Sequence, residues 1–233
     1  MANHGKKYQE AEKLVEKDRL YTPREAVEIA KKASFANFDE SVELHFRLGV
    51  NPRHADQQVR GVASLPHGLG KPIRVLVFTQ GEGERVARES GADYVGADDL
   101  IKQIEGGWLE FDVAIATPDM MPKIGKLGKI LGRRGLMPNP KAGTIANPED
   151  LSRVIEEVRQ GRIEFKLDRT ALIHLPIGKV SFTDENLVEN LTSVVDAIVS
   201  AKPSGAKGQY IRGISLATSM GPGIKLDVGS IAA

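Results

Sequence analysis

Two styles of hydrophobic patterning alternate along the chain. In residues 41–48 every second position is apolar, which is typical of a strand that buries one face. Residues 73–78 and 111–116 carry almost unbroken apolar runs, as expected for parallel strands covered on both faces. The alternating style returns after residue 160. The pattern therefore predicts an antiparallel part built from both chain ends and a parallel part between them.

Capping signals predict where two of the helices begin. Thr22 precedes Pro23, and Glu25 follows three residues after the cap, so a helix should run from here to about Lys32. Thr183 caps a longer helix that should end near residue 201. The other elements expected are helices over residues 6–18, 82–90, 98–105 and from 147, and strands over residues 59–65, 91–95, 162–167, 171–175 and 210–217. The strands at 162–167 and 171–175 are compatible with a hairpin.

The style changes at the Gly- and Pro-rich segment 66–72 and again near residue 160. The fold class expected is α/β: residues 1–67 and 160–233 form one discontinuous α+β domain, and residues 68–159 form an inserted Rossmann-like α/β domain. Two adjacent chain crossings would make a double hinge, about which we expect the domains to move as rigid bodies. The hinge residues expected are Pro66, Gly68, Gly70 and Gly161.

Composition first argues against a nucleic-acid partner, because 32 Lys and Arg nearly balance 31 Asp and Glu among 233 residues. Resolved along the chain, however, the balance conceals three basic segments, at residues 47–74, 120–148 and 197–226. The glycine-rich segment 120–148 is the densest and holds no acid, so it is either a phosphate-binding surface or a solvated basic loop. Its cations are Lys123, Lys126, Lys129, Arg133, Arg134 and Lys141.

Cysteine is absent, which excludes disulfides, thiolate metal sites and a cysteine nucleophile. No apolar run is long enough for a membrane span or a secretory signal, so we expect a cytoplasmic protein. Residues 79–84 follow a strand but have two glycines and two acids where a dinucleotide fingerprint needs three glycines. The pair His54 and Asp56 is better explained as loop polar residues than as metal ligands. We expect no cofactor, no metal and no catalysis.

The turn at residues 219–223 combines a hydroxyl, a flexible apolar side chain and a rigid Gly-Pro-Gly sequence. Such a turn can enter an RNA groove, with its hydroxyl on a 2′-OH and its Met stem over a sugar or base. It can equally bury Met220 in the core before a tight turn. The pattern alone leaves both interpretations open.

Several longer motifs, taken together, are more specific. They are Phe38-Asp39-Glu40-Ser41-Val42-Glu43, Asp56-Gln57-Gln58-Val59-Arg60-Gly61, Leu65-Pro66-His67-Gly68, Phe111-Asp112-Val113, the segment 135–144, Ile177-Gly178-Lys179, Lys202-Pro203, Ala206-Lys207-Gly208 and Ser219-Met220-Gly221. In their order and over essentially the full length, the chain resembles the bacterial ribosomal protein L-one family. The resemblance implies a terminal domain that holds a stem-and-loop region of large-subunit ribosomal RNA. The residues it implies for that contact are Phe38, Ser41, Arg53, Arg60, Lys179, Lys207, Ser219, Met220 and Gly221.

The resemblance also implies the biological setting. A member of this family is a non-enzymatic constituent of the mobile stalk of the large subunit, near the exit site, and a monomer when free. It takes part in the release of deacylated tRNA and represses its own operon by binding an RNA mimic in the messenger RNA. A possible secondary RNA contact would use Lys126, Arg133, Arg134 and Lys141. The rivals are a nucleotide-dependent enzyme built on the central α/β part and a protein–protein adaptor.

Three residues depart from the family's pattern. Ser219 stands where the family usually has Thr, which keeps the hydroxyl and loses a methyl contact. Arg133 replaces a Pro, so we expect added charge and a looser loop. Ala171 stands where a Gly is common, which puts a glycine-dependent turn in doubt because a positive φ strains Ala.

Overall fold

The computed structural model describes residues 5–229 and divides the chain into two compact units. The terminal unit consists of Met1–Gly70 and Ile163–Ala233, and the central unit of Lys71–Arg162. The expected domain limits, at residues 67 and 160, lie close to these. The terminal unit is built around one hydrophobic cluster, and the central unit around two clusters, one on each face of its parallel sheet.

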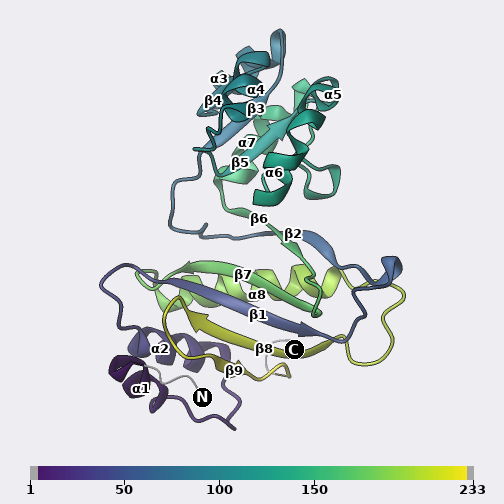
Figure 1. Cartoon of the computed structure of the whole chain (residues 1–233). Coiled ribbons are helices and arrows are strands. Elements are labelled where there is room, and N and C mark those ends of the chain that lie inside the picture. The colour runs from purple at the N-terminus through teal and green to yellow at the C-terminus, as the bar shows by residue number, and fades with distance from the viewer. Residues whose placement is uncertain (1–4, 230–233) are drawn as a thin grey trace. The chain divides into compact units, whose positions relative to one another are not determined.

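A four-stranded antiparallel sheet forms the body of the terminal unit (Figure 1). Its order is β7-β1-β8-β9, with β1 (Ser41–Leu48) between β7 (Leu172–Lys179) and β8 (Ile211–Thr218), and β9 (Ile224–Leu226) at the edge. The predicted alternation along β1 is confirmed, because its even-numbered residues are buried and its odd-numbered residues are half-buried or exposed. The apolar residues therefore face one side of the sheet only.

Helices α2 (Pro23–Ala33) and α8 (Asp184–Ser200) pack on that side and contact each other and the strands. Both predicted caps are formed: Thr22 and Glu25 make a capping box, and the Thr183 hydroxyl accepts from the Asn186 amide. Helix α1 (Lys6–Glu12) is shorter than the expected span of 6–18. Only Ala11 of α1 is buried, so little packing is available to extend the helix.

The hairpin with which the sequence is compatible is not formed between β6 and β7. Strand β6 (Arg162–Lys166) pairs with β2 (Arg60–Ser64) in a separate two-stranded sheet, whereas β7 pairs with β1 along almost its whole length. The intervening turn is held by the Asp168 carboxylate, which accepts from the Thr170 and Leu172 amides. Each strand therefore finds its partner in the N-terminal segment of the chain.

Ala171, at the end of this turn, adopts φ 63°, and among described residues other than glycine it alone has positive φ. The turn that the family's glycine would favour is thus kept with Ala in place. The carbonyl of Ala171 accepts from the Leu48 amide at 3.0 Å, which ties the turn to the end of β1.

The central unit has a parallel sheet of order β4-β3-β5, covered by helices on both faces, as the apolar runs predict. The strands are β3 (Val75–Phe78), β4 (Tyr94–Gly96) and β5 (Val113–Ala116). The longer helices are α3 (Glu82–Glu89), α4 (Asp98–Glu105) and α7 (Leu151–Arg159). The shorter ones are η2 (Pro118–Met120), α5 (Met121–Ile124), η3 (Gly125–Leu127), α6 (Gly128–Arg134), η4 (Pro140–Ala142) and η5 (Pro148–Asp150), and the terminal unit adds η1 (Ala55–Gln57).

Candidate nucleic-acid interface

The turn after β8 lies beside the start of β1, although the two segments are far apart in sequence. The Ser41 amide donates to the Ser219 hydroxyl at 3.0 Å, and the Ser219 amide donates to the Ser41 carbonyl at 3.0 Å. The Ser219 side chain is therefore fixed by the backbone of the neighbouring strand. The two segments form one surface, and each helps to hold the other in place.

A buried carboxylate holds these segments from below. Glu40 is completely buried, and its Oε1 accepts from the amides of Phe35 and Ala36, while its Oε2 accepts from the Met220 amide at 3.0 Å. Burial opposes ionisation, but hydrogen bonds from Ala36, Met220, Thr218 and Phe35 outweigh it and lower the pKa of Glu40. An ionised carboxylate thus joins the loop before β1 to the turn after β8.

Phe38 and Met220 project from this framework into solvent. Phe38 is 58 % exposed and Met220 is 52 % exposed, so the alternative of a core Met before a tight turn is excluded. Large apolar side chains on rigid, hydrogen-bonded loops are unfavourable in water and typically mark contact surfaces. Neither side chain contributes to the core of the unit.

Gly221 and Lys179 complete the surface. The Gly221 amide donates to the Thr218 hydroxyl at 3.1 Å, and a Cβ on Gly221 would lie 2.4 Å from that oxygen. Lys179, at the end of β7, donates to the Ser41 hydroxyl at 2.8 Å. We call this set the turn surface. It consists of Phe38, Ser41, Lys179, Ser219, Met220 and Gly221.

The other three cations expected at the interface lie elsewhere in the terminal unit. Arg53 follows the C-terminal end of β1 and Lys207 precedes β8, so both lie at the opposite end of the sheet from Met220. An eight-residue strand spans about 26 Å, which sets the scale of this separation. Arg60, on β2, forms an ion pair with Glu164 on β6. The structure thus gathers six of the nine expected residues and leaves three apart.

In the central unit, the expected basic loop is mostly helical. Ile124, Leu127 and Leu131 are buried at helical spacing, so this segment folds into α5, η3 and α6 instead of a solvated loop. Arg133 lies in the last turn of α6, which Gly135 caps at φ 72°, so the expected loosening is wrong. The cations expected to make a secondary contact, Lys126, Arg133, Arg134 and Lys141, are all exposed.

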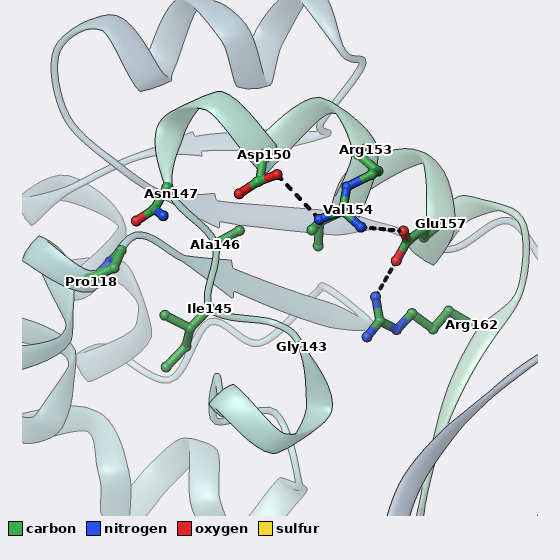
Figure 2. Close-up of a pocket in the computed structure, with 10 residues that line it drawn as sticks. All are labelled: Pro118, Gly143, Ile145, Ala146, Asn147, Asp150, Arg153, Val154, Glu157 and Arg162. Carbon is green, nitrogen blue, oxygen red and sulfur yellow. Dashed lines mark hydrogen bonds and ion pairs between the residues drawn. The ribbon is translucent and has the colours of Figure 1, made fainter. Parts of the chain in front are cut away.

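The central unit also contains a pocket of about 450 Å³ between α7 and the segment 143–147 (Figure 2). Its two arginines are already paired, Arg153 with Asp150 and Glu157, and Arg162 with Glu157. Because carboxylates neutralise both cations that line it, the pocket offers a phosphate group little net positive charge.

Two of the four expected hinge residues, Gly68 and Gly70, are held within the terminal unit. The buried side chain of Asn190 accepts from the His67 amide and donates to the carbonyls of Gly68 and Ile177. A Cβ on Gly70, at φ 71°, would lie 2.6 Å from the Phe182 ring. Sequence reasoning missed Asn190 and the role of Glu40. An Asn within an apolar helical face was the available signal for the first.

The described residues contain no group of three or more side chains able to hold a metal ion. Among the same residues, 5–229, no helix is long and apolar enough to cross a membrane.

Comparison with known proteins identifies the family. A sequence model of the Ribosomal protein L1p/L10e family matches residues 30–222. Curated relatives, each named "Large ribosomal subunit protein uL1", include one from Dehalococcoides mccartyi that is 60% identical over 233 residues, covering 100% of this chain and 98% of the relative. One from Thermomicrobium roseum is 61% identical over 231 residues, covering 99% and 96%. One from Chloroflexus aggregans is 53% identical over 232 residues, covering 99% and 98%. The chain therefore belongs to the Ribosomal protein L1p/L10e family and is a ribosomal protein, not an enzyme.

Proposed function

We propose that this chain is a structural protein of the large ribosomal subunit in the cytoplasm, and that it binds large-subunit ribosomal RNA through the turn surface. The observation that carries the proposal is the framework around Glu40, which presents Phe38 and Met220 to solvent on fixed backbone. Because the framework is already ordered, little conformational entropy is lost when RNA binds.

Each member of the turn surface has a chemistry that suits structured RNA. The Phe38 ring offers a face on which a base can stack, and the Met220 stem can cover a sugar. Lys179 places a cation beside the Ser41 hydroxyl, where a phosphate or 2′-OH can be contacted. Formal net charge is only +1 for the whole chain, so shape and placement must supply what bulk charge does not.

Replacing Met220 tests the proposal. Met220→Ala should weaken binding of a large-subunit RNA fragment by about 1–3 kcal/mol, roughly 5- to 150-fold, because one covering contact is lost. Val199→Ala is the matched control, since Val199 is a comparably exposed apolar residue on α8, at 45 %. Filter binding that gives the same affinity for both variants would remove Met220 from the interface.

The turn surface could serve a second RNA of similar shape. We propose that it also binds an RNA of similar shape in the protein's own operon message and so represses translation. Chemical footprinting of both RNAs, with and without the protein, should protect a common structural element. Competition between the two RNAs for one protein molecule should be complete, and simultaneous binding would count against a shared surface.

The exposed cations of the central unit suit a second RNA, which we propose is exit-site tRNA, whose release the protein assists. Reversing Arg133 and Arg134 to Glu should weaken tRNA crosslinking on the ribosome and leave affinity for the ribosomal RNA fragment unchanged.

Calorimetry with ATP and NAD tests the rival nucleotide site, and micromolar binding would revive it. Protein purified after gentle lysis should carry RNA in its ultraviolet absorbance, whereas an adaptor would not. Gel filtration should give the free protein as a monomer.

A further inference from the structure

Two histidines oppose each other on the side of the terminal sheet that α2 and α8 leave open. His45 on β1 pairs in register with His174 on β7. Their Nδ1 atoms are 2.8 Å apart, and their rings meet edge to face with centroids 5.0 Å apart. Adjacent strands fix both backbones, so the convergence of the two nitrogens is built into the sheet.

The pair lies beside a groove that leaves room for an ion and that carries charges of both signs. His45 lies on a groove of about 600 Å³, which Ser215 and Gly213 of β8 also line. Glu43 interacts electrostatically with His45. Asp168 interacts electrostatically with His174, so a carboxylate lies near each ring. Arg47, Arg212 and Lys225 also line the groove and oppose a cation there.

The nitrogen separation can be compared with the separations that two metal geometries require. Metal–imidazole bonds of about 2.05 Å place two nitrogens about 3.3 Å apart at a tetrahedral angle and about 2.9 Å apart at a right angle. The observed 2.8 Å, which is also an ordinary hydrogen-bond length between the two rings, is close to the right-angle value. Right-angled nitrogen ligands are typical of tetragonal Cu²⁺ and Ni²⁺, and imidazole affinity also peaks at Cu²⁺ among the first-row divalent ions.

We propose that His45 and His174 form a binding site for a tetragonal divalent transition-metal ion, Cu²⁺ or Ni²⁺, through their Nδ1 atoms. Water would fill the remaining positions, because the described residues supply no third side chain arranged as a ligand. Without metal, one Nδ1 carries a proton and donates a hydrogen bond to the other Nδ1. When metal binds, that proton moves to Nε2 of the same ring, so two neutral imidazoles coordinate with no net release of protons.

The test titrates Cu²⁺ into the full-length protein and follows the visible absorption and electron paramagnetic resonance of the ion. All proteins carry His4→Gln, so that a histidine near the chain's first residue does not compete. One equivalent should bind with the spectrum of equatorial nitrogen ligands. His45→Gln and His174→Gln should each weaken binding at least about tenfold, because each removes one ligand. His54→Gln, in an exposed loop, is the matched control and should bind as the parent does.

Two results would overturn the site. The first is equal affinity and stoichiometry in the parent and in the double His45→Gln, His174→Gln variant. The second is Zn²⁺ binding as tightly as Cu²⁺, which would contradict the right-angled geometry. Circular dichroism shows whether each variant is folded. The two single substitutions lie on different strands, so either one alone keeps the test decisive.

Discussion

At the scale of single residues, the turn surface depends on Glu40, a buried residue that is not itself part of that surface. Its two oxygens accept three backbone amides from two distant segments, so it does in this site what a cross-strand hydrogen bond does in a sheet. Phe38 and Met220 make the proposed contacts with RNA, and the hydrogen bonds of Glu40 hold the backbone segments that carry these two side chains. Ser219 also holds the turn in place, because its hydroxyl accepts a hydrogen bond from the Ser41 amide of β1. The methyl group of the family's Thr is not needed for that bond.

Glu40→Gln should destabilise the fold by about 1–3 kcal/mol, because one acceptor becomes an amide donor facing a backbone N–H. RNA affinity should fall as well, since the Met220 turn loses its anchor. Urea unfolding and filter binding measure the two effects. Glu43→Gln, on the open side of β1, is the control and should leave stability within about 0.5 kcal/mol of the parent.

The pH dependence of stability gives a separate test of Glu40. Its pKa is lowered in the folded state, so the stabilisation it provides is present above the unfolded pKa, about 4.3, and is lost as pH falls through the folded value. The difference in unfolding free energy between parent and Glu40→Gln should therefore shrink below about pH 4. A difference that stays constant between pH 7 and pH 3 would show that the charge contributes nothing.

At the scale of elements, local sequence signals predicted helices and strands correctly where tertiary contacts favoured the same structure. The caps at Thr22 and Thr183 and the alternation along β1 are all observed. Pairing was harder, because β6 and β7 are adjacent in sequence yet each has its partner in the N-terminal segment. The glycine-rich basic segment looked like a loop, but its buried apolar residues at helical spacing outweighed the low helix propensity of Gly.

The turn between β6 and β7 carries a prediction at this scale. Ala171→Gly should stabilise the protein by about 0.5–1 kcal/mol, because Gly avoids the left-handed strain of Ala and loses part of that gain to backbone entropy. Ala201, at the end of α8 with φ −82°, is the matched control, and Ala201→Gly should not stabilise. Thermal unfolding measures both. A lower melting temperature for Ala171→Gly would mean that the Cβ of Ala171 makes a contact worth more than the strain.

At the scale of the whole molecule, charge is balanced and binding must come from placement. The expected cations are not equivalent, because Arg60 is paired with Glu164 whereas Lys207 is exposed in the loop before β8. The Asn190 contacts fasten residues 67 and 68 to the terminal unit. We expect the two units to move as rigid bodies about the two segments that connect them. One pivot should lie after Gly70, and the other at Gly161, which has φ 104°.

Lys207→Ala should lower the slope of log affinity against log salt by about 0.7–0.9, the value of one phosphate contact. Arg60→Ala should lower it less, because Glu164 already neutralises part of that charge. Filter binding of the ribosomal RNA fragment at several salt concentrations gives both slopes. Unchanged slopes in both variants would exclude the two side chains from phosphate contact.

The sequence by itself determined the local structure and the family. Helix caps, alternating strands and apolar runs depend on neighbouring residues, so they can be read along the chain. The tertiary structure alone decided which segments meet. It paired β7 with β1 and β6 with β2, and it buried Glu40 beneath both segments of the turn surface. It also brought His45 and His174 together from 129 positions apart. These outcomes depend on long-range strand register, which no periodicity within a single segment encodes.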